Sequence, residues 1–375
     1  MDGLNTILAL GRDESKEARF QFRWRLRPEE ILEIIRKRIS GATESIRQKC
    51  LVPFPGQTPQ QGNLKIDHYP VVELGSGAFG QVWKTVDAYS GDMIAVKLIT
   101  RPKNDPRNGR WERMVANTRD REVFLLSRYR HHYIVPYLGS QGWDTDSVQI
   151  FMPVKSGTLM NLVFTNPSFD QVVEIGNAAL LQMLSALDFL AHHGLIHRDV
   201  KPENILYDRD HLGAYHFQLA DFGLSTLQSV ARSAVGTPNF VAPEIDDGNM
   251  PQTSKADIWS LFVTMLWVFN EDLFRHRIEM GELLNALELR RAILSLAVNN
   301  ENLRFIRDMG IVDPEYRASA AQQLARWGRQ DLMTTTGVML PEDTQFDRWM
   351  DAIYSGQSKI SDNLMDIITN AGGNR

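Results

Sequence analysis

The chain has 375 residues, of which 43% are hydrophobic, so it can bury a large core and form more than one domain. Its formal net charge of −5 excludes a nucleic-acid binder that works through bulk positive charge. The single cysteine, Cys50, excludes an intramolecular disulfide and fits a reducing compartment. We therefore expect an intracellular protein, in the cytoplasm or the nucleus, with no nucleic-acid partner.

The apolar segments lack the features of targeting sequences. Residues 1–16 have no basic start and no cleavage pattern, so a signal peptide is not expected. The longest apolar stretch, residues 258–269, is shorter than the roughly 20 residues that cross a bilayer. It is interpreted as a buried helix, and no membrane span is expected.

Residues 1–64 are predicted to form an N-terminal extension that ends in a linker. From Arg19 to Arg27, apolar residues alternate with glutamine and arginine, which predicts a strand. Pro28 and the two glutamates after it favour a helix start, and the Pro-, Gly- and Gln-rich stretch 51–63 is typical of a linker. The extension is expected to brace the next lobe or to be the remnant of a truncated domain. Contact with a partner, an anionic surface or nucleic acid is the weaker alternative.

The pattern along the chain predicts an α+β protein with two lobes. Residues 65–155 are interpreted as a small lobe with strand-like runs at 71–75, 80–88, 92–100, 134–140 and 147–154 and one helix-like run at Arg119–Tyr129. Residues 156–330 form a helical lobe, with helical patterns at 172–194, 254–269, 280–297 and 319–327. The tail, 331–375, has one amphipathic pattern around Asp347–Tyr354. Ligands often bind between two such lobes.

The first chemical motif is a glycine-rich segment that contains Gly75, Gly77 and Gly80. Glycine lets the backbone approach a phosphate closely. Dinucleotide-binding turns have a similar glycine pattern, but they lead into a helix. Here Gln81–Val86 alternates like a strand, which predicts a hairpin over a nucleotide. A glycine-rich hairpin without a ligand is the alternative that this motif alone leaves open.

The second motif is Lys97, which needs an acidic partner to be more than a solvated charge. Glu122 is the preferred partner because the hydrophobic pattern that follows it fits a helix best. Glu112 and Asp120 are competing acids. The pair would hold the lysine ammonium group against the α- and β-phosphates of a nucleotide.

The third and fourth motifs carry the acids and amide that phosphoryl transfer needs. In His197–Asn204, which reads HRDVKPEN, Asp199 is predicted to orient the attacking hydroxyl and Lys201 to neutralise a γ-phosphate. Asn204 and Asp221, the first residue of Asp-Phe-Gly, are predicted to hold magnesium, which prefers oxygen ligands.

These ordered motifs resemble the eukaryotic protein kinase family over roughly residues 66–330. Ala242–Glu244 resembles the motif that closes the activation segment, and Arg317 resembles the arginine that pairs with its glutamate. Asp257 resembles the aspartate that anchors the catalytic loop, whereas Phe262 stands where the family usually has glycine. The segment 313–322 resembles fungal kinases.

The resemblance implies a signalling enzyme that uses ATP and Mg2+ and phosphorylates proteins on serine or threonine. Lys201 and the segment Gly236–Pro238 resemble serine/threonine kinases, and Thr237 is expected to contact Asp199. An upstream kinase is an expected partner. A pseudokinase that serves as a binding or scaffold module is the alternative, although such proteins typically lose residues of the Lys97, Asp199 or Asp221 type.

The resemblance also implies which residues surround the adenine base. These residues are Val82, Ala95, Leu206, Phe151, Met152 and Val154. The hinge departs from the family pattern because it lacks the common acidic residue and because Pro153 has no N–H. The sequence leaves open whether Phe151 or Met152 is the gatekeeper.

Arg198, directly before Asp199, resembles the arginine of kinases that are switched by phosphorylation of the activation loop. The candidate phosphorylation sites are Ser225, Thr226, Ser229 and Ser233. The spacing to Gly236 favours Ser233.

Overall fold

The computed structural model describes residues 66–77, 80–88, 90–102, 109–165, 167–227, 237–246, 252–283, 285–358 and 365, together with two strands near the N-terminus. Contacts divide the chain into two units, Met1–Asn63 and Leu64–Arg375.

In the first unit, strands β1 (Thr6–Leu10) and β2 (Ala18–Phe22) pair antiparallel. The sequence did not predict β1. The strand predicted for Arg19–Arg27 begins at Ala18 and is described only as far as Phe22. The predicted helix after Pro28, the predicted linker and Cys50 lie outside the described residues.

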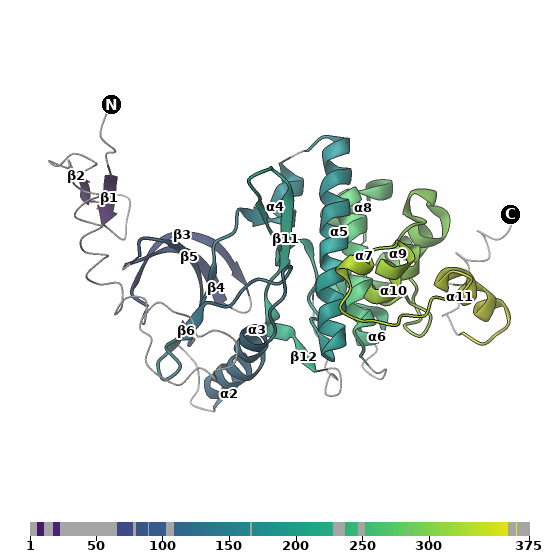
Figure 1. The fold of residues 1–375 in the computed structure, drawn as a ribbon, viewed down its shortest axis with the longest axis horizontal. Helices are drawn as coiled ribbons and strands as arrows, with labels where there is room; N and C mark the ends of the chain where they lie inside the picture. The colour runs from purple at the N-terminus through teal and green to yellow at the C-terminus, as the bar shows by residue number, and fades with distance from the viewer. Residues whose placement is uncertain are drawn as a thin grey trace. The chain divides into compact units, whose positions relative to one another are not determined.

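The second unit begins with an antiparallel sheet of five strands in the order β3-β4-β5-β7-β6 (Figure 1). The strands are β3 (His68–Gly77), β4 (Gly80–Asp87), β5 (Met93–Thr100), β6 (Gly139–Gln141) and β7 (Ser147–Pro153). Alternate residues of a strand point to one face, so Ala95, Lys97 and Ile99 share a face of the sheet. We call this side the helix face, because Trp111 of α2 packs there against Ile99. The predicted β-rich lobe is confirmed.

The helix of this lobe is longer than predicted. It runs through α2 (Arg110–Thr118), a π-helical turn (Arg119–Val123) and α3 (Phe124–Arg128). The sequence predicted a helix only from Arg119 onward, because the six polar residues 117–122 separate the short apolar stripe of Trp111, Met114 and Val115 from the apolar run after Glu122. The π-helical turn contains the buried residue Glu122, and such turns are frequent at functional sites.

The predicted helical lobe is also confirmed. Its helices are α4 (Leu159–Phe164), α5 (Phe169–His192), α6 (Pro243–Asp246), α7 (Lys255–Phe269), α8 (Phe274–Glu279), α9 (Ala286–Asn299), α10 (Ala320–Arg326) and α11 (Gln345–Tyr354). Strands β8 (Gly157–Thr158), β10 (Ile205–Arg209) and β11 (Tyr215–Leu219) form a small sheet, and β9 (Leu195–Ile196) pairs with β12 (Thr226–Leu227).

The long helix α5 runs through the middle of this lobe (Figure 1). It begins at Phe169, earlier than the predicted 172, because Ser168 and Gln171 form a capping box there. Its length and hydropathy would also suit a membrane span, but 56% of its most apolar window is buried within the protein. Within the described residues, α5 is therefore a core helix.

Helix α9 begins later than the pattern over 280–297 predicted. Gly281 has a left-handed φ of 73°, and the Asn285 side chain accepts a hydrogen bond from the N–H of Glu288. A left-handed residue ends a helical path, and asparagine is a favoured N-cap. Leu283, before Asn285, therefore lies outside the helix.

Parts of the predicted tail pack onto the helical lobe. Ser185 of α5 donates to the carbonyl oxygen of Leu332 at 2.6 Å, and buried Asp188 accepts hydrogen bonds from the backbone of Thr334 and Thr335. Helix α11 buries Trp349 in a small apolar cluster with α9. The chain after residue 330 thus contributes to the lobe's core.

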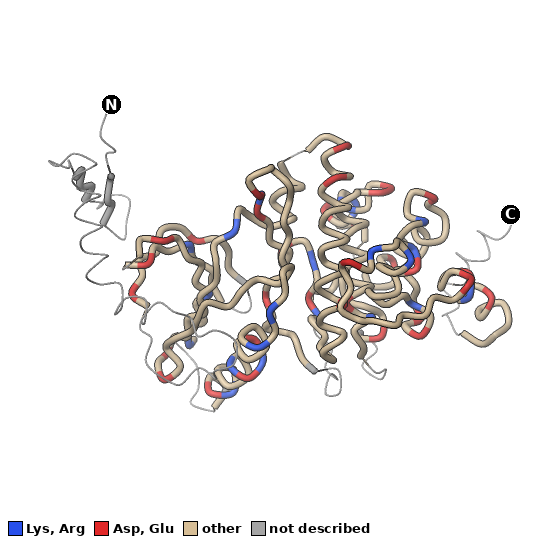
Figure 2. The backbone as a smooth tube through the Cα atoms, viewed as in Figure 1, with Lys and Arg blue, Asp and Glu red and all other residues tan. Residues whose placement is uncertain are grey.

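Figure 2 shows that acidic and basic residues are interspersed over the described part of the second unit. No lobe there carries only one sign of charge, which agrees with the small net charge of −5.

Phe262 of α7 is fully buried and fills the space in front of Gly310. A Cβ atom on Gly310 would lie 2.3 Å from Cε1 of the Phe262 ring. We expect Gly310→Ala to lower the free energy of unfolding by roughly 1–3 kcal/mol, because the ring must leave its rotamer or the backbone must shift. Urea denaturation measures this change.

Gly139→Ala is the matched control, because its Cβ would make only an ordinary contact of 3.8 Å with Ile66. Adding Phe262→Leu to Gly310→Ala should recover part of the loss. Equal stabilities of the two alanine variants would contradict the predicted clash.

Candidate active site

Lys97 lies between two carboxylates. Its Nζ donates to Glu122 Oε1 at 2.8 Å and to Asp221 Oδ1 at 2.8 Å. Burial alone would lower the pKa of Lys97, but the two carboxylates outweigh it and raise the pKa above its ordinary value. The ammonium group therefore stays charged and links the helix of the first lobe to the Asp-Phe-Gly segment of the second.

The two competing acids lie elsewhere. Glu112 pairs with Arg101, with Nη2 and Oε1 3.2 Å apart, and Asp120 contacts Arg119 on the exposed side of the helix. Neither reaches Lys97. The structure thus forms the predicted Lys97–Glu122 pair.

The Asp199 carboxylate is surrounded by three polar side chains, of which Thr237 was the predicted neighbour. Thr237 Oγ1 donates to Asp199 Oδ1 at 2.8 Å, and Asn204 Nδ2 donates to Oδ2 at 2.8 Å. Lys201 Nζ lies 2.8 Å from Oδ2 and donates to Thr237 Oγ1 at 2.6 Å. These four side chains form one polar cluster whose carboxylate has a fixed direction, as a group that orients a hydroxyl requires.

A buried carboxylate of α7 holds the loop that carries Asp199. Asp257 accepts the backbone N–H of His197 at 2.8 Å and that of Arg198 at 2.7 Å. The His197 ring accepts from the N–H of Asp199 through Nδ1, and Nε2 lies 3.0 Å from the carbonyl oxygen of Ala220. Burial lowers the pKa of His197, which favours the neutral ring that fits both contacts.

The two predicted metal ligands lie on neighbouring backbone segments. The N–H of Ala220 donates to the carbonyl oxygen of Asn204 at 2.9 Å, and Asp221 follows directly. Asp221 adopts φ 61°, while the ring of Phe222 is buried edge-on against His197. Burial favours protonation of Asp221, but Lys97 outweighs it and lowers the pKa of the carboxyl.

An amide and an ionised carboxylate supply the oxygens that Mg2+ prefers. The described residues contain no cluster of three or more His, Cys, Asp or Glu that would hold a metal ion by itself. Asn204 and Asp221 therefore fit an ion that takes its remaining oxygen ligands from phosphates or water.

The glycine-rich segment is a hairpin, as predicted. Gly77 at the end of β3 lies opposite Gly80 at the start of β4, and Gly75 lies opposite Val82. Gly80 has φ 115°, and a Cβ there would lie 2.4 Å from the carbonyl oxygen of Leu98, so only glycine fits. No helix begins within the described part of the glycine-rich segment, which excludes the dinucleotide-binding geometry there.

The strand register places two more predicted nucleotide residues together. Val82 lies opposite Lys97 on the helix face. Ala95 is on the same face, two residues along β5. Leu206 comes from the second lobe, on β10 opposite Thr158 of β8. Apolar side chains from two lobes are what a flat base needs on its two sides.

The register of β5 and β7 separates the two gatekeeper candidates. Met152 lies opposite Ala95, so its side chain points to the helix face. Phe151 lies opposite Val96 on the other face, where its fully buried ring meets His68 edge-on at 5.5 Å. The expectation that the Phe151 side chain contacts the base is therefore corrected, and the geometry favours Met152 as gatekeeper. Val154 follows β7 in the hinge.

The glutamate after Ala242-Pro243 is tied to Arg317 in the core. Both side chains of this ion pair are fully buried, and the two Glu244 oxygens accept from Arg317 at 2.6 and 3.0 Å. The guanidinium also donates to the carbonyl oxygens of Lys255, Ile311 and Val312. A buried charge pair is tolerated when all its hydrogen-bonding groups are satisfied, as they are here.

Two of the candidate phosphorylation sites are inaccessible. Ser225 is 1% exposed and donates to the carbonyl oxygen of His197, and Thr226 is 7% exposed in β12. The expectation that Ser225 or Thr226 is a phosphorylation site is therefore wrong for this conformation, because a kinase must reach the hydroxyl group. Ser229 and Ser233 lie outside the described residues.

The sequence did not single out Arg121, the residue directly before Glu122. Its charge lowers the pKa of Arg198, although burial is the larger cause, which indicates that the two arginines lie near each other. Arg198 also donates through Nε to the carbonyl oxygen of Leu224 at 2.8 Å. The sequence offered one indication of this neighbour of Arg198: Arg121 directly precedes Glu122, which was already expected to face the site.

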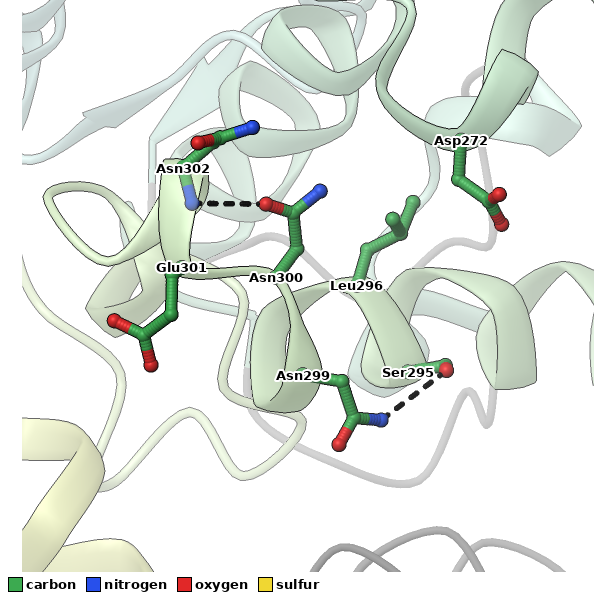
Figure 3. A pocket seen from close by; sticks show the side chains of 7 residues that line it. All are labelled: Asp272, Ser295, Leu296, Asn299, Asn300, Glu301 and Asn302. Atoms are coloured by element: carbon green, nitrogen blue, oxygen red, sulfur yellow. Dashed lines mark hydrogen bonds between the residues drawn. The ribbon is translucent and has the colours of Figure 1, made fainter.

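A separate hollow of about 450 Å3 lies in the second lobe and contains none of these residues (Figure 3). It is lined by Asp272, Ser295, Leu296, Asn299, Asn300, Glu301 and Asn302. Several of its polar groups bond to one another, for example Asn302 N–H to Asn300 Oδ1 at 2.9 Å.

Comparison with known proteins agrees with the fold and the site. A sequence profile described as Protein kinase domain matches residues 70–327. MAP3K epsilon protein kinase 1 of Arabidopsis thaliana is 33% identical over 201 residues, which are 52% of this chain and 14% of that protein. CBL-interacting protein kinase 2 of Oryza sativa subsp. japonica is 25% identical over 334 residues, which are 84% of this chain and 72% of that protein.

The chain belongs to the protein kinase family, because the kinase profile matches more than half of its length. The family and the bilobal fold predicted from the sequence are thereby confirmed. The chain corresponds to only 14% of the length of the Arabidopsis relative.

The buried carboxylate under the catalytic loop predicts a specific pH dependence of stability. Burial raises the pKa of Asp257 to about 6, against the opposing hydrogen bonds from His197 and Arg198. An acid with a raised pKa in the folded state stabilises the fold at low pH, and this contribution is lost as the pH rises through about 6. Relative to Asp257→Asn, the wild type should lose about 1 kcal/mol of unfolding free energy between pH 5 and pH 7.5.

Urea denaturation across this pH range measures the difference. Asp120→Asn is the control, because Asp120 is exposed and lies away from the catalytic loop. A wild-type-to-Asp257→Asn difference that stays constant with pH would show that Asp257 does not titrate in this range.

Proposed function

We propose that this protein is a serine/threonine protein kinase that depends on ATP and magnesium. The observation that carries the proposal is the orientation of Asp199 by Thr237, Asn204 and Lys201 within one polar cluster. A carboxylate held in this way can orient a serine or threonine hydroxyl and accept its proton.

The residues around the cluster supply the positioning and the positive charge that phosphoryl transfer requires. Lys97 is held by Glu122 and is placed to contact phosphate oxygens of the nucleotide. Asn204 and Asp221 would hold magnesium, which neutralises the charge of the phosphates when it is bound. Lys201 adds a second cation beside Asp199. The contribution of the protein is thus mainly geometric and electrostatic.

The binding-module alternative lacks support from the site. A module that only binds has no need of a complete acid, amide and lysine set, and here Lys97, Asp199 and Asp221 are all present and mutually oriented. A kinase whose products are phosphoproteins also needs protein substrates that bear serine or threonine.

Asp221→Asn tests the enzyme directly. It removes the charge beside Lys97 and should lower kcat for phosphate transfer from ATP by at least about 100-fold. The measurement is magnesium-dependent incorporation of labelled phosphate into a peptide array in which serine, threonine and tyrosine alternate as acceptor. Label is expected on serine and threonine only.

Asp120→Asn is the control, since Asp120 is an exposed aspartate on the helix that carries Glu122. It should leave the rate unchanged. Equal incorporation by the wild type and Asp221→Asn would refute the proposed chemistry, and label on tyrosine would refute the proposed acceptor.

We also propose that phosphorylation of Ser233 by an upstream kinase raises the activity. Arg198 and Arg121 lie near each other, and Arg198 donates through Nε to the carbonyl oxygen of Leu224, close to the start of the segment that carries Ser233. A phosphoserine at position 233 would pair with arginine and stabilise the position of Thr237.

Ser233→Ala measures this switch. Wild type and variant are assayed before and after phosphatase treatment. Activity should fall roughly tenfold on phosphatase treatment of the phosphorylated wild type, to the level of the variant. An unchanged rate after phosphatase treatment of both forms would exclude the switch.

A further inference from the structure

The hinge is tied to the β10–β11 hairpin by one carboxylate that the predicted site does not include. Asp208 Oδ2 accepts from Lys155 Nζ at 2.9 Å, and Oδ1 accepts from both the N–H and the Oγ of Ser156, each at 2.9 Å. The N–H of Ser156 also donates to the carbonyl oxygen of Tyr207 at 3.0 Å. Two consecutive hinge residues are thus fixed by two consecutive residues of β10.

This contact is more than a solvent-exposed ion pair. The Lys155 side chain is only 12% exposed, and that of Asp208 is 34% exposed. Burial raises the pKa of Asp208, but the hydrogen bonds from Lys155 and Ser156 outweigh it and hold the pKa below its ordinary value. Asp208 therefore stays ionised at neutral pH, and a partly buried charged hydrogen bond is stronger than an exposed one.

The hinge has few backbone donors for a base. Pro153 has no N–H. The N–H of Ser156 already donates to Tyr207 and Asp208. Of residues 153–156, only Val154 and Lys155 retain an N–H that makes no backbone hydrogen bond within the described part of the chain. Adenine presents an acceptor nitrogen next to a donor amino group, so it needs one such N–H and one carbonyl.

We propose that Asp208 is a positioning residue for the nucleotide base. Through Lys155 and Ser156 it fixes the backbone that carries the two remaining N–H groups of the hinge. We call the contacts of Asp208 with Lys155 and Ser156 the clamp. Leu206 lies on the same strand as Asp208, so the clamp also sets the distance between the hinge and this apolar residue, which is expected on one side of the base. This inference rests on the proposed kinase function and assigns a role in nucleotide recognition to a residue outside the catalytic cluster.

The test is steady-state kinetics of the full chain with Asp208→Ala and with Lys155→Met. Asp208→Ala should raise the KM for ATP roughly fivefold, and Lys155→Met should raise it less, because the hydrogen bonds of Ser156 to Asp208 remain. In both variants kcat at saturating ATP should stay within about twofold of the wild type. Guanine presents the opposite donor and acceptor pattern, so the preference for ATP over GTP should fall in both variants. A role in general stability would not change this preference.

Asp210→Ala is the matched control. Asp210 lies just beyond β10 in the same hairpin and accepts from the N–H groups of Leu212 at 2.8 Å and Ala214 at 2.9 Å. Its replacement should loosen the tip of the hairpin and leave the KM for ATP unchanged. The double variant Asp208→Ala with Lys155→Met should be no worse than Asp208→Ala alone, because the loss of the carboxylate already removes its contact with Lys155.

Asp208→Asn replaces Asp208→Ala in this test if the alanine variant does not fold. Its amide oxygen can still accept hydrogen bonds from Ser156, but the negative charge that pairs with Lys155 is lost. It should give an intermediate KM. An active wild type with unchanged KM and unchanged base preference in folded Asp208 variants would overturn this inference and leave the kinase proposal standing. An inactive wild type would defeat both.

Discussion

The geometry of the catalytic loop depends on one buried carboxylate, Asp257, in the first turn of the core helix α7. Burial of a carboxylate without hydrogen-bond donors costs several kcal/mol, so the backbone N–H groups of His197 and Arg198 are held against it. The constraint keeps Arg198 at a left-handed φ of 69°, a conformation that a non-glycine residue adopts only when its surroundings enforce it. Asp199 is the next residue, so the backbone fixed by Asp257 also determines the direction of the Asp199 side chain.

Lys97 connects this anchored loop to the other lobe. It is bound at once to Glu122 in a π-helical turn and to Asp221 beyond β11, so the two lobes share one buried network of charges. A shift of the helix changes what Lys97 can contact, and the set of phosphate-binding groups changes with it. The position of the helix that carries Glu122 therefore determines whether the site is complete. A change in this position is one way in which the activity can be regulated.

Much of the site could be predicted from the sequence because each motif is short and its chemistry is local. The pairs Lys97–Glu122 and Glu244–Arg317 were expected and are present. The start of the helix at Arg110 was missed, since six polar residues, 117–122, interrupt the apolar pattern between Val115 and Val123. The choice between Phe151 and Met152 needed the pairing of β5 with β7, because a one-residue change of register exchanges the two faces of a strand. The clamp at Asp208 joins residues 52 and 53 positions apart, which no local pattern reveals.

Phe262 departs from the family pattern at one position of the sequence, but the space that its ring needs is provided by a second residue, Gly310. The bulk that the aromatic ring adds to α7 is accommodated by the missing side chain across from it. The two positions are therefore coupled in packing, because a large side chain at one requires a small residue at the other. An engineer who restores glycine at position 262 alone would create a void, so the pair must be redesigned together.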